Sequence, residues 1–391
     1  MCSKSRKQWL AVLALYLFTL PPTLALAGKP DKPGGGGGEP ANALLIAQLD
    51  AGGDAADIND LREVVGAVTT ESGDSVAAYW TVTESNGLIT SNRTLLWDGY
   101  LAYAINNHGE IVGESFDSFG NYVAIYWPDS SSAAVELPSL PDHPISVAQG
   151  INNDGLICGY VSKNVLDDND NPIPGTVDVP AHRAVVWRVL PTDGAPIISG
   201  PFELPSDGDD SNSAANALND NDEFGIAEVV GYRASAVSGE GGPFLWGVKS
   251  LDDGTVSILT IPLLGDGMPI GVNNNGVICG RLIGRSGEED ALVWSGDTVS
   301  FLDRGKGRNK VPAAWALDIN ESGLIVGWAG TYIDSHACFW DGIEGTVTYL
   351  DDYLESDSPL LGLIRARDVN AFGDIVGIGQ TGSFIAIPVS Q

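Results

Sequence analysis

Short apolar segments separated by turn residues run along most of the chain, and one pattern of segment and turn recurs seven times. In each copy an apolar segment leads into an Asn, and a second apolar segment ends in a Gly. Apolar runs of this length between Asn, Asp and Gly turns predict β-strands joined by hairpins. The recurring residues are Asn59, Asn106, Asn152, Asn219, Asn273, Asn320 and Asn370, with Gly66, Gly113, Gly159, Gly231, Gly280, Gly327 and Gly377.

Most copies continue into two further apolar segments. The third segment ends in Trp, as in Ala-Ile-Tyr-Trp127, and the fourth resembles Val-Ser-Phe-Leu302. A four-strand unit of about 40–50 residues is typical of a β-propeller blade, whereas a β-solenoid, the weaker alternative, has a shorter period. The pattern therefore predicts an all-β fold, a seven-bladed β-propeller.

The two ends of the repeat region complement each other. The seventh copy stops after its third strand, at residues 383–388, and a lone apolar strand at residues 43–49 precedes the first copy. Pairing these two strands would complete the last blade and remove an exposed sheet edge. We expect a single propeller domain over residues 43–391, closed by its N-terminal strand.

The segment before the repeats has the pattern of a secretory signal peptide. Lys4, Arg6 and Lys7 precede a short apolar run that Pro21 and Pro22 end, and a small-residue site favours cleavage after residue 27. An uncleaved membrane anchor is the alternative. Residues 28–42 form a Gly/Pro-rich linker. These features predict a secreted, periplasmic or cell-envelope location, with no membrane span after cleavage.

Charge narrows the range of partners. The chain has 51 acidic and 20 basic residues, for a net charge of −31, and 43% of its residues are hydrophobic. An acidic surface repels phosphate, which argues against nucleic acid and anionic membranes as partners. Cys158 and Cys279 occupy a position that is Val in other copies, so we expect buried thiols and no disulfide.

The repeats resemble those of a known family, the HAF-repeat proteins, described as extracellular repeat proteins. That pattern runs approximately Ala-x-Gly-Ile-Asn-x-x-Gly-x-Val-Val-Gly and then His-Ala-Phe-Leu-Trp. Residues 149–159 match its first part, and His336 matches the His of the second. The resemblance covers about residues 43–388 and implies secretion and repeats, with no catalytic residues. The His position is otherwise Val76, Val123, Arg183, Gly242 or Asp290.

The recurring polar and aromatic residues are interpreted mainly as structural. The Asn-x-x-Gly turns lack the alternating oxygen ligands of a calcium loop, because strands begin directly after the Gly. Asn at such a turn is expected to bond its own backbone. The Trp residues that end the third strands are expected to pack between blades. Trp315 and Trp328 lie off this pattern and are predicted to contact a ligand.

The residue two positions before each Asn separates the copies into two groups. Four copies have a small residue there, whereas the sixth, seventh and first copies have Asp318, Asp368 and Asp57. Ring closure makes these three copies neighbours, so their carboxylates should converge beside the central channel. Clustered carboxylates suit a divalent cation such as calcium, or acid–base chemistry. Alternatively, each Asp accepts a hydrogen bond from a nearby backbone amide.

The loops opposite the Asn turns vary most, and binding residues often lie on such loops over a rigid scaffold. Asp167, Asp168 and Asp170 form the best local cation candidate there, although Pro172 stands where an EF-type loop has Gly. Only four His residues are present, and no nucleophile elbow, zinc-protease or phosphate-loop motif occurs.

Two functions remain open. The first is a secreted scaffold without catalysis that binds a protein or glycan ligand. The second is a glycan-active hydrolase or lyase propeller that uses the axial carboxylates, since carboxylate chemistry needs no His or Ser.

Overall fold

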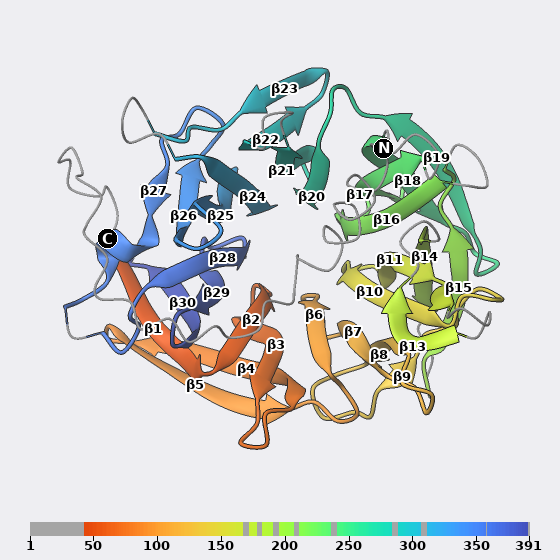
Figure 1. Cartoon of the computed structure of the whole chain (residues 1–391), viewed down its shortest axis with the longest axis horizontal. Helices are drawn as coiled ribbons and strands as arrows, with labels where there is room; N and C mark the ends of the chain where they lie inside the picture. The colour runs from red at the N-terminus through yellow and green to blue at the C-terminus, as the bar shows by residue number, and fades with distance from the viewer. Residues whose placement is uncertain are drawn as a thin grey trace, which may run out of the picture.

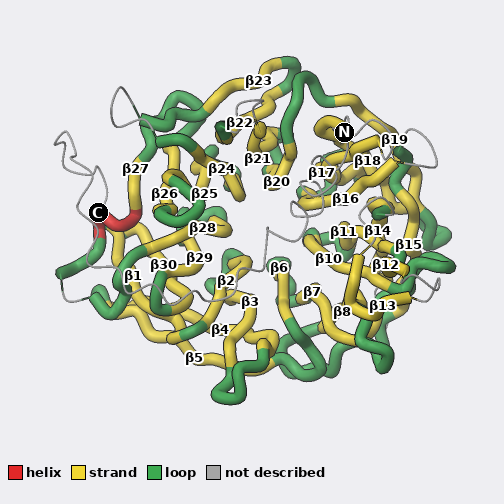
Figure 2. Tube along the Cα trace, viewed as in Figure 1, coloured by secondary structure: helices red, strands yellow, loops and turns green. Residues whose placement is uncertain are grey.

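The structure is a computed structural model that describes residues 43–389, except 167–171, 178–181, 191–194, 207–210, 236–240, 284–287, 306–310 and 357. The predicted signal peptide (1–27) and linker (28–42) lie outside the described residues. The described chain is all-β, as predicted: strands and loops make up nearly all of it, with a short 3-10 helix, η3 (Leu350–Tyr353) (Figure 2). None of the described helical segments has the length and hydrophobicity needed to span a bilayer.

The described strands form seven four-stranded units arranged in a ring around a central axis (Figure 1). Unit 1 comprises β2 (Gly53–Ile58), β3 (Glu63–Thr69), β4 (Ser75–Ser85) and β5 (Leu88–Leu95). Unit 2 comprises β6 (Leu101–Ile105), β7 (Ile111–Phe116), β8 (Tyr122–Trp127) and β9 (Val135–Glu136). Unit 3 comprises β10 (Ile145–Ile151), β11 (Leu156–Ser162), β14 (Arg183–Leu190) and β15 (Ile197–Glu203), with a separate hairpin of β12 (Asn164–Leu166) and β13 (Pro172–Val177).

Unit 4 comprises β16 (Ser211–Leu218), β17 (Ile226–Ser235), β18 (Gly241–Ser250) and β19 (Val256–Pro262). Unit 5 comprises β20 (Met268–Val272), β21 (Val277–Ile283), β22 (Glu289–Ser295) and β23 (Thr298–Phe301). Unit 6 comprises β24 (Ala313–Ile319), β25 (Leu324–Gly330), β26 (Ser335–Asp341) and β27 (Thr348–Tyr349). Units 5 and 6 are joined by a parallel bridge between Glu289 and Ala313.

Unit 7 takes strands from both ends of the chain. Its order is β28 (Leu363–Val369), β29 (Ile375–Gly379), β30 (Gly382–Pro388) and β1 (Leu44–Ala51). β1 pairs with β30 in antiparallel register from Leu44↔Pro388 to Ala51↔Gly382. The pairing predicted between the first and last segments is therefore present.

The recurring Gly residues are explained by a close approach of two backbones. The inner strand of every unit has a β-bulge at the residue three positions before the Asn, such as Gln149 between Ala148 and Gly150. The Gly lies against this bulged strand. A Cβ on Gly159 would lie 2.0 Å from the carbonyl oxygen of Val147, and one on Gly327 would lie 1.9 Å from that of Trp315. Only Gly fits at this position.

The six Trp residues of the third strands pack between units, as predicted, although only β8 ends at its Trp. All six are fully buried or nearly so, at 0–1% exposure. Five donate their indole N–H to a carbonyl of the preceding inter-unit link: Trp127 to Trp97, Trp187 to Pro138, Trp246 to Pro205, Trp294 to Leu264 and Trp340 to Asp303. Trp80 has no such partner among the described residues, because β1 runs into β2 with only Gly52 between them.

Candidate functional site

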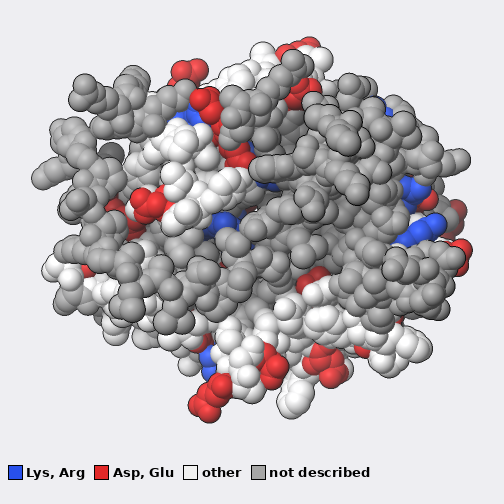
Figure 3. Space-filling view, viewed as in Figure 1, with Lys and Arg blue, Asp and Glu red and all other residues white. Residues whose placement is uncertain are grey.

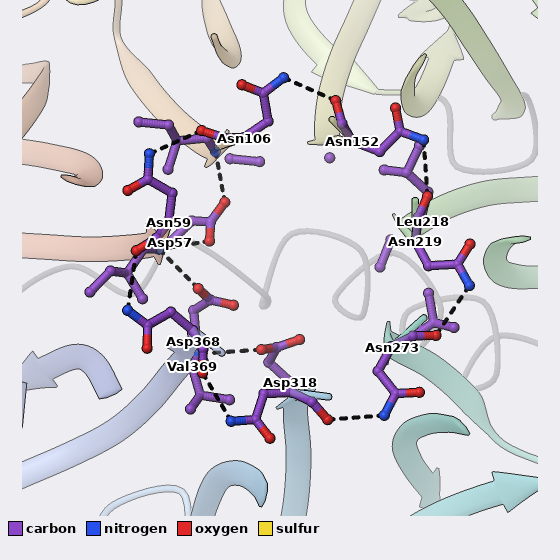
Figure 4. A pocket seen from close by; sticks show the side chains of 18 of the residues that line it. Asp57, Asn59, Asn106, Asn152, Leu218, Asn219, Asn273, Asp318, Asp368 and Val369 are labelled. Atoms are coloured by element: carbon purple, nitrogen blue, oxygen red, sulfur yellow. Dashed lines mark hydrogen bonds between the residues drawn. The ribbon is translucent and has the colours of Figure 1, made fainter. Parts of the chain in front are cut away.

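The seven recurring Asn residues form a closed ring around the axis (Figure 4). Each Asn side chain donates from Nδ2 to the backbone carbonyl of the next Asn, at 2.9–3.2 Å, and the last bond runs from Asn370 to Asn59. In six units Oδ1 of the Asn accepts two backbone N–H groups of its own turn; Asn152, for example, accepts from Asp154 and Leu156. Oδ1 of Asn219 accepts the N–H of Glu228, beyond the insertion of the fourth copy. The predicted bonding within each turn is present, but the bonds between units were not foreseen.

A second belt lies at the next residue of each turn. Asn107 accepts the N–H of Asp60, Asn153 accepts that of Asn107, and Asp220 accepts that of Asn153, all at 2.8–2.9 Å. The series continues through Asn274 and Glu321 and resumes where Asp60 accepts the N–H of Ala371. It is interrupted at Ala371, whose side chain has no acceptor. The mouth of the channel on the turn face is therefore lined by amides and carboxylates.

Inside these two belts lies a cavity of about 350 Å³. Its wall includes the bulge residue of every unit, because the bulge turns two successive side chains toward the axis. These residues are Ala56, Tyr103, Gln149, Asn216, Ile270, Leu317 and Arg367. The cavity opens among the Asn turns, whereas the sequence favoured ligand contact on the opposite face.

Asp57, Asp318 and Asp368 line one side of this cavity, so the structure brings these three predicted residues together (Figure 4). Asp57 and Asp368 share the N–H of Ile58, at 2.7 and 2.9 Å. Asp57 also accepts the N–H of Ile105 at 2.7 Å, in the next unit.

Asp318 accepts the N–H of Val369 at 3.2 Å, again in the next unit. The backbone-amide alternative is thus realised, and the carboxylates also face one another.

The three carboxyl groups differ in their electrostatic environment. Burial, followed by the charges of Asp57 and Asp318, raises the pKa of Asp368 well above its ordinary value. Burial also raises the pKa of Asp57 and of Asp318, but hydrogen bonds from Asp368 and from backbone N–H groups oppose that shift. The two neighbouring carboxyl groups therefore raise the pKa of Asp368, whereas the hydrogen bonds from Asp368 lower the pKa of Asp57 and of Asp318.

The cation predictions receive no geometric support. Asp167, Asp168 and Asp170 lie outside the described residues. Among the residues that the structure describes, no group of three or more His, Cys, Asp or Glu side chains is arranged to hold a metal ion. A divalent cation such as calcium stays a prediction.

Trp315 and Trp328 lie side by side near the end of the channel opposite the Asn turns. Their rings are 5.2 Å apart between centroids, and their side chains are 3% and 1% exposed. Tyr332 contacts both rings. The two indoles are covered by neighbouring side chains in this structure, and a ligand contact through them stays a prediction.

Sequence reasoning missed the polar residues that directly follow the recurring Gly. Arg281 is 2% exposed and lies over the Trp315 ring, with its Cζ 3.4 Å from the ring centroid. At the same position in unit 2, burial raises the pKa of Glu114 to about 7. The signal that could have located them is a charged residue inside an otherwise apolar second strand.

The structure also shows the state of the cysteines. Cys158, Cys279 and Cys338 are free and buried.

The turn of the first copy differs from the others. It has Arg62 in place of the turn Gly, with a positive φ of 59°, and Arg62 pairs with Asp374 of unit 7 at 2.8 Å. Figure 3 shows acidic side chains at the upper and lower edges of this face.

No family model and no curated protein matches this chain. Among solved structures, a gluconolactonase from Xanthomonas campestris is similar at 12% identity and a TM-score of 0.39, covering 88% of this chain and 89% of its own. A mutant of AofleA from Arthrobotrys oligospora is similar at 10% identity and a TM-score of 0.42, covering 89% and 93%. A β-fructofuranosidase from Microbacterium saccharophilum follows at 11% and 0.34, covering 74% and 77%. None of these three reaches a TM-score of 0.5, so the function proposed below rests on the site itself.

Proposed function

We propose that this chain is a closed seven-bladed β-propeller whose axial cavity is the active site of a glycan-active hydrolase or lyase. The observation that carries the proposal is the convergence of the Asp57, Asp318 and Asp368 carboxyl groups on the wall of a cavity of about 350 Å³, where burial and the two neighbouring charges raise the pKa of Asp368. That volume lies at the lower end of the range for ligand pockets, about 300–1,000 Å³.

The chemistry follows from the unequal pKa values. Asp368 is the general acid that protonates a leaving oxygen, and Asp57 or Asp318 is the base that takes a proton from water or from the sugar. Tyr103, Gln149 and Asn216 on the other walls supply hydrogen-bonding groups that could orient sugar hydroxyls. The cavity admits a short saccharide segment rather than a folded protein.

A turnover screen tests the proposal. Soluble polysaccharides and oligosaccharides are incubated with the wild-type chain, with Asp368→Asn and with Asp341→Asn. Asp341 is an exposed residue at the end of β26, the third strand of unit 6, and it is the control. General acid catalysis contributes about 10²- to 10⁴-fold, so Asp368→Asn is expected to lower turnover at least 100-fold. Asp341→Asn should retain wild-type turnover.

Two results would contradict the proposal: no cleavage of any saccharide by the wild-type chain, or equal cleavage by wild type and Asp368→Asn. The necessary control is that the variant is folded, as shown by a cooperative thermal unfolding transition.

A propeller that binds glycan or protein without catalysis is the second candidate. It is favoured by the hydrogen bonds from backbone N–H groups to all three carboxylates, a structural role that needs no chemistry. Saturable binding on a glycan array without turnover would support this candidate over the first.

We also propose that the chain is secreted or located in the cell envelope and belongs with the HAF-repeat proteins. The leader pattern of residues 1–27 and the seven Asn and Gly positions support this proposal. Mass determination of the exported chain, with an N-terminus at residue 28, is the direct test.

A further inference from the structure

A cluster of arginine and aromatic side chains lies at the end of the channel away from the Asn turns. Arg281 on β21 stacks on Trp315, and Arg365 on β28 lies near Trp328, with its Cζ 5.9 Å from the ring centroid. Arg367, two residues after Arg365, pairs with Asp54 at 2.7 Å and lines the cavity. In a chain with a net charge of −31, this is a local concentration of positive charge.

The cluster has hydrogen-bond donors without acceptors. Among the described residues, Nε of Arg281, Nε of Arg365 and the indole N–H of Trp328 are buried and have no hydrogen-bond partner. Nη2 of Arg281 lies 3.6 Å from the sulfur of Met268, which is a weak acceptor. Buried donors of this kind are almost always satisfied in folded proteins.

The two carboxylates nearby bond other groups, although Oδ1 of Asp54 has no hydrogen-bond partner among the described residues. Glu289 accepts the indole N–H of Trp315 and the hydroxyl of Tyr332. Asp54 bonds Arg367. Burial and the neighbouring positive charges lower the pKa of Arg281 and of Arg365 to about 10, so both remain charged at neutral pH. Three guanidinium groups thus face two carboxylates, and an unpaired buried charge is costly.

We propose that Arg281 and Arg365 bind one anionic group, the carboxylate or sulfate ester of an acidic saccharide. Guanidinium groups match such anions through paired N–H donors, and the exposed ring of Tyr332 beside them can pack against a sugar face. Tyr332, which is 55% exposed, connects the cluster to solvent.

This inference rests on the proposed function for the saccharide part of the ligand. β28 carries both Arg365 and Asp368, and three residues of a strand span about 10 Å. One extended ligand could therefore place its anionic group at Arg365 and its reacting bond at Asp368. The substrate class is then an acidic polysaccharide rather than a neutral one.

Calorimetric titration of the full chain tests the inference. Galacturonic acid oligomers, galactose oligomers of the same length, and sodium sulfate are each titrated into wild type, Arg365→Gln, Arg365→Lys and Arg93→Gln. Arg93 is an exposed arginine paired with Asp50 and serves as the matched control. The acidic oligomer is expected to bind at least tenfold more tightly than the neutral one.

Arg365→Gln should abolish that preference, and Arg93→Gln should preserve it. Arg365→Lys should weaken the binding of the acidic oligomer by a smaller factor than Arg365→Gln does, because lysine keeps the charge but loses the planar pair of donors. If Arg365→Gln does not fold, the proposal is tested by whether Arg365→Lys binds the acidic oligomer more weakly than wild type does. Equal binding of the two oligomers, or a preference that survives these substitutions, overturns the proposal. Sulfate binding as tightly as the acidic oligomer would overturn its saccharide part.

The failure of this inference and of the proposed function are distinguishable. Asp368→Asn should lose turnover while still preferring the acidic oligomer. Acid preference in a chain that cleaves nothing would support the anion site and contradict the hydrolase or lyase.

Discussion

Two sectors of the same ring use different residues at an equivalent position. In units 6, 7 and 1, the residue two before the Asn is Asp318, Asp368 or Asp57, and its carboxylate accepts the N–H of the residue before the next Asn. In units 2 to 5 the equivalent residues are Ala104, Gly150, Ala217 and Gly271, which have no acceptor. We call these the acidic sector and the neutral sector.

The comparison separates what holds the ring together from what gives it chemistry. The Asn-to-Asn bonds run through both sectors without a break, so the scaffold does not depend on the carboxylates. The carboxylates satisfy three backbone donors, but the charges of Asp57 and Asp318 also raise the pKa of Asp368, which a purely structural position would avoid. The Asn pattern that all units share is structural, whereas the proposed function rests on the departure from it in units 6, 7 and 1.

The largest expected effect is on the Asn ring itself. Asn152→Ala in the neutral sector and Asn320→Ala in the acidic sector should each lower the free energy of unfolding by about 3 kcal/mol or more. Each substitution leaves two N–H groups and one carbonyl without partners, at about 1–3 kcal/mol for a buried group. Urea unfolding measures both variants. A loss confined to one sector would contradict a common scaffold.

The next effect is a dependence of stability on pH that arises in the acidic sector. The folded-state pKa of Asp368 is raised above its unfolded value, so its contribution to stability is fully present below about pH 4 and is lost as pH rises toward the folded pKa. Asp368→Asn should therefore be more stable than wild type at pH 8, by roughly 1–4 kcal/mol for like charges a few ångströms apart. The difference should vanish at pH 4. A pH-independent difference would disprove the charge repulsion.

A substitution can extend the acidic sector by one unit. Ala104 lies two residues before Asn106, at the position that Asp57 occupies in unit 1, and it lines the cavity. Ala104→Asn should accept the N–H of Ile151 and add about 0.5–1 kcal/mol to the free energy of unfolding. Ala104→Asp adds the same acceptor with a charge, so it should become less stable than Ala104→Asn as pH rises. Denaturant unfolding of the pair at pH 5 and pH 8 measures this, and identical pH profiles would contradict it.

The smallest effect lies outside both sectors, at His336. Its hydrogen bond to Asp351, at 2.8 Å, raises its pKa. The contribution of His336 to stability is then present below its unfolded pKa of about 6.5 and lost as pH rises through the higher folded pKa. His336→Gln should remove this dependence, with a change in unfolding free energy of about 1 kcal/mol or less. Thermal unfolding between pH 6 and pH 9 measures it. Asp341→Asn, an exposed residue of the same strand, is the control.

The fold was predictable because its information is local and repeated. Each copy carries its own strand pattern, and the missing strand of the seventh copy is supplied visibly by residues 43–49. The convergence of Asp57, Asp318 and Asp368 also followed from the order of the copies. The sequence of one copy does not determine the distance to the neighbouring copy. The hydrogen bond from each Asn side chain to the carbonyl of the next Asn could therefore not be predicted.

The rest of the cavity could not be predicted because its residues share no property. The bulge brings Tyr103, Gln149 and Arg367 to the axis, yet residues at this position range from Ala to Arg and give no periodic signal. The pairing of Arg281 with Trp315 depends on contact between units 5 and 6. Such contacts come from packing across the ring, which a single copy does not encode.

The joining of β1 to β30 has a consequence for how the chain is ordered. The N–H of Val389 bonds the carbonyl of Ala43 at 2.9 Å, so the first and last described residues are neighbours just beyond the paired ends of β1 and β30. A short linker between them would make unit 7 covalently continuous, and the chain could then begin at Gly52, between β1 and β2. The order of the units is cyclic, so the molecule is a candidate for circular permutation. The hydrogen bonds between β1 and β30 already hold together the two ends that the linker would join.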